Sequence, residues 1–239
     1  MRLPWALRTD GNYWFQQNVL QNGFLSNQVV CDIGGGSRPW LSPEEKQRLN
    51  LKVVGIDISE EELQAAPAGA YDKIIAADIC KFVGDASFDV VICQALLEHV
   101  PDTKGALRAI ASSLKPNGLA YIFVPCRNAL FAQINRALPQ DLKRRILFFF
   151  WPYAAEGHDG FYAYYDGCSP STVEAVARDL GLEAQDKRAF WASGYFYFFL
   201  PAYFLWRFYQ LISWSILGED SCESFCFVLR KSPAAIGAE

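Results

Sequence analysis

Histidine and methionine are scarce in this chain, which has two histidines and one methionine among its 239 residues. Neither histidine lies in a recognisable metal-binding motif, and the seven cysteines lack the paired spacing of zinc sites. We therefore expect no metal site. Because most of the cysteines lie in or beside strand-like apolar runs, we interpret them as buried, reduced thiols of a cytosolic protein.

An excess of positive charge is also absent, since 22 Lys and Arg residues oppose 26 Asp and Glu residues and leave a net charge of −4. The basic residues form no long stripe, so we expect no nucleic-acid partner. The stretch from Met1 to Gly11 has no apolar run of the length that a secretory signal needs, which predicts a cytoplasmic location. No repeat divides the chain, and residues 1–239 are expected to form a single domain.

The most informative motif is a short β-branched run that ends in three glycines, within Val29–Ser37. Such a run predicts a strand buried on both faces, followed by a loop whose backbone can approach a ligand closely. A dinucleotide fingerprint would need a glycine at position 39, which is Pro39, and Asp32 would repel a pyrophosphate. The same carboxylate attracts the ammonium and sulfonium groups of S-adenosylmethionine, so the charge favours this cofactor over NAD.

Further polar and apolar residues follow the next three predicted strands. Asp57 lies 57 − 32 = 25 residues after the first acid, near the separation of about 20 residues at which a second-strand acid meets a ribose diol. Asp78 can accept a hydrogen bond from the adenine amine, while Ile58 and Ile79 can cover the two faces of the ring. Gln94, at the end of the fourth strand, completes the predicted cofactor-binding residues.

Together, and over roughly residues 27–125, these motifs resemble the class I S-adenosylmethionine-dependent methyltransferases. The resemblance is to the broad small-molecule group with a Leu-Leu-Glu-His-Val segment after the fourth strand, here Leu96–Val100. It implies that Asp32, Gly34 and Gly36 surround the methionine moiety of the cofactor. It also implies that the acid after the second strand binds the ribose, and that the third acid and its isoleucine contact adenine.

Alternating strands and helices predict a doubly wound, Rossmann-like α/β fold with a seven-stranded sheet. We expect strands over 28–33, 52–57, 73–77, 88–93, 119–124 and 182–190, and helices over 43–49, 59–66, 102–114 and 169–181. A last strand over 223–231 is antiparallel in the resembling family and lies beside the sixth strand.

Two hydrophobic segments, residues 126–168 and 192–222, are additional to this plan. Both leave the sheet at the carboxyl ends of strands, where open α/β sheets bind ligands, so we expect them to wall the active site. The first joins a basic cluster to an apolar run over 143–151, and the second has eleven aromatic residues over 195–217. Basic flanks beside aromatic side chains are typical of an interfacial helix.

The second segment is long enough to span a bilayer, but Arg207 would then lie in its apolar interior, and the last strand would lie across the membrane from its sheet. We therefore predict a helical hairpin or cap that lies on the membrane surface or closes over an apolar substrate. A buried cap and a dimer interface are alternatives.

The two histidines are the candidate general bases. His99 belongs to the segment that faces the cofactor's methyl group in the resembling family, although a structural role of the Glu98–His99 pair is an alternative. His158 lies on a glycine-flanked loop that resembles a movable lid, or is an exposed loop histidine. The aromatic segment Tyr13–Phe15 either folds over the cofactor or packs on the sheet.

Methyl transfer from a sulfonium is an in-line displacement in which the protein mainly orients the two reactants at about 3 Å. A base is needed only for a poor nucleophile such as a neutral hydroxyl. We hypothesise methylation of a hydroxyl on a small or amphiphilic acceptor, such as a lipid-linked saccharide, a quinone precursor or another lipid, at the inner face of the membrane. The alternative is a non-catalytic, membrane-associated scaffold that binds the cofactor.

Overall fold

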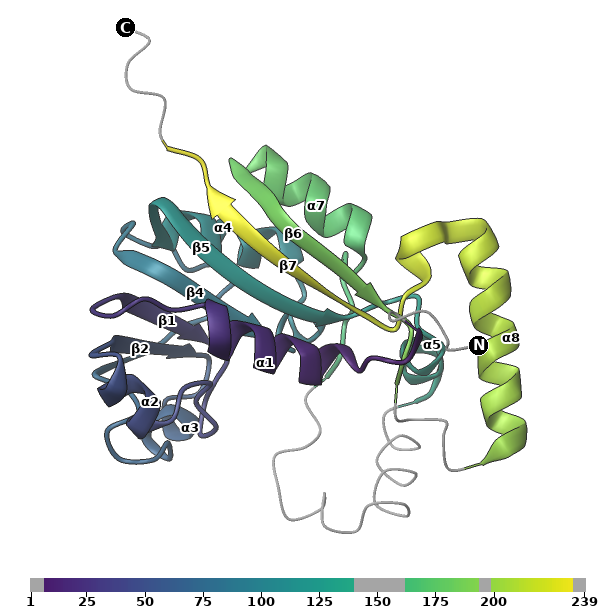
Figure 1. Cartoon of the computed structure of the whole chain (residues 1–239), viewed down its shortest axis with the longest axis horizontal. Coiled ribbons are helices and arrows are strands. Elements are labelled where there is room, and N and C mark those ends of the chain that lie inside the picture. Colours follow the sequence, from purple (N-terminus) through teal and green to yellow (C-terminus); the bar gives the residue numbers. More distant parts are fainter. Residues whose placement is uncertain (1–6, 140–161, 194–198, 234–239) are drawn as a thin grey trace, which may run out of the picture.

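The structure, a computed structural model, describes residues 7–139, 162–193 and 199–233. In this part of the chain one seven-stranded sheet has the order β3-β2-β1-β4-β5-β7-β6, with helices against both faces (Figure 1). The strands are β1 (Val29–Ile33), β2 (Lys52–Asp57), β3 (Lys73–Ala76), β4 (Phe88–Gln94), β5 (Leu114–Pro125), β6 (Leu182–Phe190) and β7 (Ser224–Lys231). The α-helices are α1 (Gly11–Asn22), α2 (Pro43–Arg48), α3 (Glu60–Gln64), α4 (Thr103–Ser113), α5 (Leu130–Ala137), α7 (Pro170–Asp179) and α8 (Leu200–Leu217), and η2 (Leu97–His99) and η5 (Gly218–Ser221) are short 3-10 helices.

The strand order reverses beside β1, which lies between β2 and β4 and pairs in parallel with both. β7 lies between β5 and β6 and is antiparallel to both. The predicted doubly wound, Rossmann-like sheet with an antiparallel last strand is therefore confirmed. In such sheets ligands bind beyond the carboxyl ends of the strands, at the point where the order reverses.

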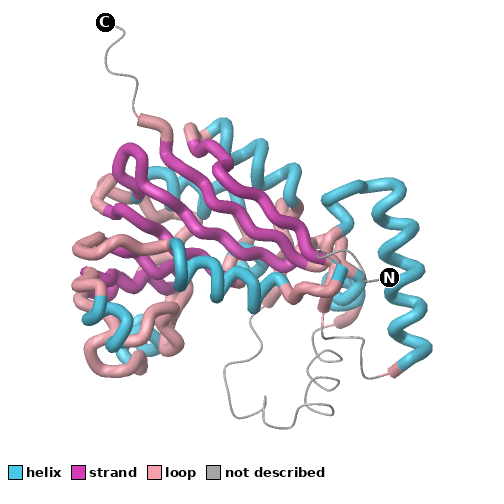
Figure 2. The backbone as a smooth tube through the Cα atoms, in the orientation of Figure 1, coloured by secondary structure: helices cyan, strands magenta, loops and turns pink. Residues whose placement is uncertain are grey.

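The central strands are apolar on both faces because helices cover both faces. Val90, Val91 and Ile92 of β4 are fully buried, as are Val30 and Cys31 of β1. Figure 2 shows these strands as an inner layer with helices in front of it and behind it. This two-sided burial explains why the strands form continuous β-branched runs in the sequence instead of alternating patterns.

Two of the three aromatic residues of α1 pack on the sheet, where this helix contacts β5 and β7. Phe15 is buried with its ring 5.8 Å from that of Phe123, and the ring of Trp14 lies 5.5 Å from that of Phe190. Tyr13 is exposed. Of the two interpretations of this aromatic segment, packing on the sheet describes Trp14 and Phe15.

The strand boundary that differs most from prediction is the start of β5. The strand begins at Leu114, which pairs with Phe88, and regular pairing resumes after a bulge at Val90 and Leu119. α4 ends at Ser113, so the predicted helix over 102–114 gives way directly to the strand. The turn expected before residue 119 is thus part of the sheet.

The two additional segments contribute α5 and α8 to the described structure. α8 is one continuous helix of 18 residues, and it contacts α5, which follows β5. Figure 1 shows that α8 lies beyond the sheet, past the carboxyl end of β6. No helix among the described residues is both long and apolar enough to cross a membrane. The basic cluster of segment 143–151 and His158 lie outside the described residues.

Candidate active site

The loop after β1 is built from glycines because its backbone is crowded on both sides. Gly34 has φ +80°, and a Cβ there would lie 2.9 Å from the side chain of Leu96. Gly36 has φ +49°, and a Cβ there would lie 3.4 Å from Oδ2 of Asp57. Because L side chains rarely adopt these φ values, glycine keeps the loop close to the ends of β2 and β4.

Asp32 lies on β1 and is 4% exposed. Its Oδ2 accepts a hydrogen bond from the Trp40 backbone N–H at 2.7 Å and one from the Tyr71 hydroxyl at 3.3 Å. Burial raises the pKa of Asp32 to about 6, although both hydrogen bonds lower it, and the nearby charge of Asp57 raises it further. A buried carboxylate of this kind is stabilised by a cation at close range.

Asp57 ends β2 opposite the glycine loop. Its Oδ1 accepts a hydrogen bond from the Ser59 backbone N–H at 3.1 Å, while Oδ2 faces Gly36. The next residue, Ile58, is 71% exposed, which is unusual for an isoleucine beside a buried strand. Carboxylate and isoleucine therefore form a polar and an apolar surface side by side, as the ribose and adenine of a nucleoside require.

Asp78 and Ile79 follow β3, and their side chains lie in different environments, the first polar and the second apolar. Oδ1 of Asp78 accepts a hydrogen bond from the Cys80 backbone N–H, and Oδ2 forms an ion pair with Lys81 at 3.2 Å. That backbone hydrogen bond, with the help of Lys81, lowers the pKa of Asp78. Ile79 is buried in the core, so only Ile58 of the two predicted isoleucines presents an exposed side chain.

Gln94 ends β4 and links three parts of the chain. Its Oε1 accepts a hydrogen bond from the Trp40 indole at 2.6 Å, and its Nε2 donates to Oδ1 of Asn12 in α1. The backbone of Trp40 also donates to Asp32, so Trp40 connects the first and fourth strand ends. Trp40, Tyr71 and Asn12 were not anticipated from the sequence, since no local motif marks them.

His99 lies in η2, a few residues beyond the end of β4. Its Nδ1 is 3.1 Å from the carbonyl oxygen of Tyr162, and its Nε2 is 3.9 Å from Oε1 of Glu98. Burial lowers the pKa of His99, although the contact with Tyr162 opposes this effect. The ring is therefore neutral at pH 7, the form that can accept a proton.

Glu98 is buried next to this histidine and has an unusual environment. Its backbone carbonyl accepts hydrogen bonds from the N–H groups of Tyr164 and Tyr165, which fixes the segment after residue 161 against η2. Its side-chain Oε2 has no hydrogen-bond partner among the described residues. Burial raises the pKa of Glu98 to about 8, so this carboxyl is largely protonated at pH 7.

The tyrosines of the same segment divide into anchoring and exposed residues. Tyr165 is buried, and the backbone carbonyl of Asp166 accepts a hydrogen bond from the Thr103 hydroxyl. The rings of Tyr162 and Tyr164 are 4.4 Å apart and are 51% and 45% exposed, respectively. An exposed aromatic pair thus borders His99.

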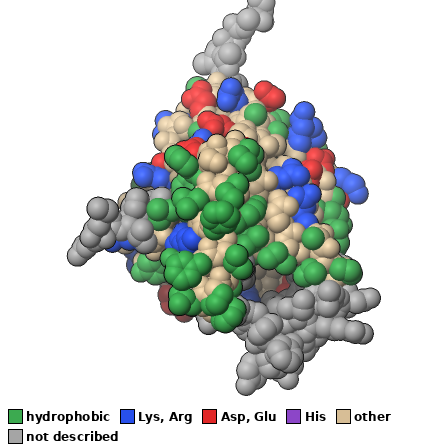
Figure 3. All heavy atoms as spheres, turned by 90° about the vertical axis from the view of Figure 1, so that its right-hand side faces the viewer, with side chains coloured by type: hydrophobic (Ala, Val, Ile, Leu, Met, Phe, Trp, Pro, Cys, Tyr) green, Lys and Arg blue, Asp and Glu red, His purple; other side chains and the backbone are tan. Residues whose placement is uncertain are grey.

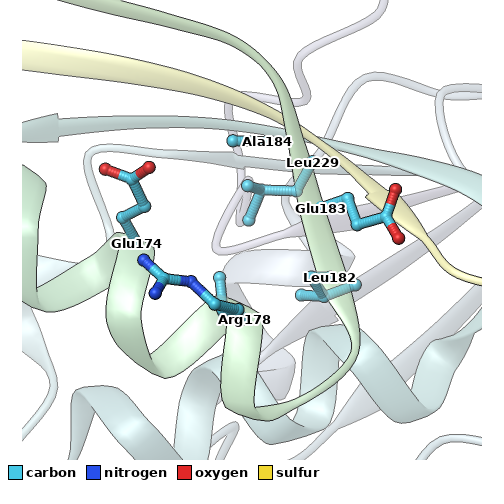
Figure 4. Close-up of a pocket in the computed structure, with 7 residues that line it drawn as sticks. Glu174, Arg178, Leu182, Glu183, Ala184 and Leu229 are labelled. Atoms are coloured by element: carbon cyan, nitrogen blue, oxygen red, sulfur yellow. The ribbon is translucent and has the colours of Figure 1, made fainter.

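A shallow cavity of about 270 Å³ lies elsewhere, between α7 and the start of β6 (Figure 4). Glu174 and Arg178 of α7 border it together with Leu182, Glu183 and Leu229. β6 runs in the same direction as β5, because β7 is antiparallel to both, so its first residues lie at the amino ends of the parallel strands. The cavity therefore lies at the amino ends of the parallel strands, whereas the glycine loop lies at their carboxyl ends.

The fold and the site together define a class I methyltransferase, and comparison with known proteins agrees. A methyltransferase-domain family matches residues 10–186. The chain belongs to this family, whose methyl donor is S-adenosyl-L-methionine. The residues fit this cofactor, because a buried acid, a glycine cradle and an exposed isoleucine meet at the strand ends where a cationic nucleoside would bind.

Curated relatives include ubiquinone biosynthesis O-methyltransferases. The chain is 30% identical to the one from Ralstonia nicotianae over 174 residues, which are 69% of this chain and 66% of that protein. It is 29% identical to the one from Bordetella bronchiseptica over 185 residues, which are 73% of this chain and 69% of that protein. The chain thus spans about two thirds of the length of these relatives.

Solved structures share the fold. An S-adenosylmethionine-dependent methyltransferase from Mesorhizobium loti superimposes with a TM-score of 0.57 at 16% identity, and the match covers 90% of this chain and 97% of that chain. The phosphoethanolamine N-methyltransferase 2 of Haemonchus contortus, solved with S-adenosyl-L-methionine, gives a TM-score of 0.56 at 17% identity and covers 95% of this chain and 54% of that chain.

We predict that Asp57→Ala weakens binding of S-adenosylhomocysteine about 10- to 100-fold. The variant removes a charged acceptor for the ribose hydroxyls, and the net loss of one hydrogen bond to a charged group, about 1.5–3 kcal/mol, corresponds to this change. Calorimetric titration measures this change. Asp85→Ala, at an exposed acid before β4, is the matched control and should bind like the wild type. Equal dissociation constants for both variants would contradict the assignment.

We also predict that Glu98 makes the folded protein less stable as pH rises. The native carboxyl keeps its proton up to pH of about 8, whereas the unfolded one loses it near its ordinary pKa of 4.5, so the unfolded state binds fewer protons between these values. The free energy of unfolding should therefore fall between pH 6 and 8, by at most about 1.4 kcal/mol per pH unit. Denaturant titrations of Glu98→Gln should show a flatter profile, and a slope as steep as that of the wild type would refute this origin.

Proposed function

We propose that this chain transfers the methyl group of S-adenosylmethionine to a hydroxyl oxygen of a small amphiphilic acceptor. The observation that supports oxygen as the acceptor atom is the orientation of His99. Because a carbonyl oxygen only accepts hydrogen bonds, Nδ1 of His99 carries the proton that faces Tyr162. The basic nitrogen of the neutral ring is then Nε2, which can take the proton of a hydroxyl.

The reaction follows from what the cofactor supplies when bound, an electrophilic methyl group on a sulfonium. Asp32 and Asp57 would hold the cationic and ribose parts of the cofactor at the ends of β1 and β2. The bound cofactor would supply a methyl group that the acceptor oxygen displaces from sulfur, with the electron pair of the broken C–S bond left on sulfur. His99 takes the hydroxyl proton in the same step, so that no charge builds up on the acceptor.

The acceptor is expected at the exposed ring pair of Tyr162 and Tyr164, beside His99. Exposed aromatic side chains favour an acceptor with a flat or apolar body. The relatives are named as O-methyltransferases of ubiquinone biosynthesis, which supports an oxygen acceptor and favours a quinone precursor over a lipid-linked saccharide. In this proposal the segments 126–168 and 192–222 wall the acceptor side at the inner face of the membrane.

The test is to incubate the protein with S-adenosylmethionine labelled in its methyl group and a membrane extract. We expect label in the organic phase, in a product that survives mild alkali, because methyl ethers resist conditions that cleave methyl esters. Label confined to water-soluble metabolites would contradict an amphiphilic acceptor. Binding of S-adenosylhomocysteine without any labelled product would contradict the enzyme and favour the scaffold.

His99→Asn separates a catalytic role of His99 from a structural one. Asparagine keeps a side-chain N–H near the Tyr162 carbonyl but has no equivalent of Nε2, so we expect kcat to fall about 10²- to 10⁴-fold. The affinity for S-adenosylhomocysteine should stay unchanged in a calorimetric titration. If His99→Asn turns over like the wild type while His99→Ala does not, the histidine only supports Tyr162.

A further inference from the structure

The side of α8 that faces the protein is narrow and carries one tryptophan and two polar residues. The buried residues of this helix are Trp206, Gln210 and Ser213, which recur every three or four positions and so lie along one side. Gln210 and Ser213 are polar, and Trp206 and Gln210 donate hydrogen bonds to the Glu223 carboxylate. A surface helix of a globular protein normally buries its apolar side instead.

The inward side of α8 is held by a hydrogen-bond network. Trp206 and Gln210 both donate to Oε1 of Glu223, at 2.7 and 3.0 Å, and Gln210 also donates to the carbonyl of Trp191. Arg207, the only charged residue of α8, donates to the carbonyls of Trp191 and Leu7. These contacts fix the orientation of the helix, which leaves most of its apolar side chains exposed.

The outward side of α8 is large and apolar. Its members are between 61% and 74% exposed: Leu200, Phe204, Leu205, Phe208, Leu211 and Ile216. Monomeric proteins rarely expose a contiguous apolar patch of this extent, and such patches mark protein or membrane interaction sites. We call this set the α8 face.

The surroundings of the α8 face match a bilayer surface. Figure 3 shows apolar side chains running down the middle of this side of the molecule, with Lys and Arg side chains on both flanks and acidic side chains mostly toward the top. A central apolar strip between basic flanks complements the acyl chains and the anionic headgroups of a bilayer. Arg207, which carries the charge of α8, is partly buried and donates to two backbone carbonyls, away from the α8 face.

The α8 face also lies on the same side as the chemistry. The Tyr209 hydroxyl donates to the backbone carbonyl of Asn128, and α8 contacts α5, so the helix is fixed beyond the carboxyl end of β5. That end of the parallel strands also carries the glycine loop and the candidate base. A bilayer that receives α8 would therefore face the side from which an amphiphilic acceptor must enter.

We infer that the α8 face docks the protein on the surface of a phospholipid bilayer, with α8 parallel to the membrane plane. This inference rests on the proposed function, because an acceptor that is dissolved in the membrane explains why the face adjoins the site. The helix lies in the headgroup region and does not cross the membrane.

Flotation with vesicles of phosphatidylethanolamine and phosphatidylglycerol in equal parts tests this inference. The full wild-type chain should float with the vesicles, and the double variant Phe208→Gln/Leu211→Gln should lose at least about tenfold in partition coefficient. Brominated acyl chains should also quench fluorescence of the wild-type protein, since Trp214 of α8 is 59% exposed. The matched control is Leu25→Gln/Val83→Gln, at exposed apolar residues before β1 and β4, which should float like the wild type.

The docking inference is overturned if the wild-type chain does not bind the vesicles, or if both double variants float equally. It is also overturned if the wild-type chain forms a dimer that does not bind vesicles and that dissociates in Phe208→Gln/Leu211→Gln. Titration with S-adenosylhomocysteine in the absence of vesicles keeps the two proposals apart. Cofactor binding without flotation would remove only the docking surface. Flotation without cofactor binding would support the docking surface and remove methyl transfer.

Discussion

The glycine loop after β1 is the constraint on which the rest of the site depends. It passes between the ends of β2 and β4, where a Cβ on Gly35 would overlap the Asp32 carboxylate and the Tyr71 hydroxyl, and where Gly34 and Gly36 have positive φ values. The loop can be this tight only because the strand order reverses at β1, which leaves a crevice beside that strand. Two acids of like charge then face the same crevice, and a cationic ligand relieves the repulsion between them.

The polar bonds around this loop extend into distant parts of the chain. Trp40 joins Asp32 to Gln94, and Gln94 joins α1 through Asn12. The N-terminal side of α1 is in turn tied to α8, because Arg207 donates to the carbonyl of Leu7. The helix that carries the α8 face is therefore connected, by hydrogen bonds and a short stretch of backbone, to the residues that border the cofactor.

Much of the sheet could be predicted from the sequence because its strands are short β-branched runs bounded by turn residues. β2 and β6 have the predicted bounds, and the two acids at the strand ends lie where the runs stop. The start of β5 could not be predicted, because Leu114 joins the sheet through pairing with Phe88 and not through its own sequence pattern. The single long α8 was likewise hidden, since the apolar composition of its segment is equally compatible with a hairpin.

The parts of the site that escaped prediction are contacts between residues far apart in the chain. Trp40 and Gln94 are 54 residues apart, and Gln94 and Asn12 are 82 residues apart, so no local spacing could reveal either bond. The burial of Glu98 and the partner of His99 depend in the same way on the return of the segment after residue 161. An apolar helix at the surface was among the expectations, but the residues that form the α8 face could not be predicted, because they depend on which side of the helix finds hydrogen-bond partners.

The central claim is that the carboxyl ends of β1, β2 and β4 hold the cofactor. Hydrogen–deuterium exchange of the wild-type protein, with and without S-adenosylhomocysteine, tests it most directly. The account predicts that the ligand slows exchange in the loop after Asp32, in the residues after Asp57 and around Gln94, with little change at the cavity between α7 and β6. Protection at that cavity, or at neither place, would contradict the account.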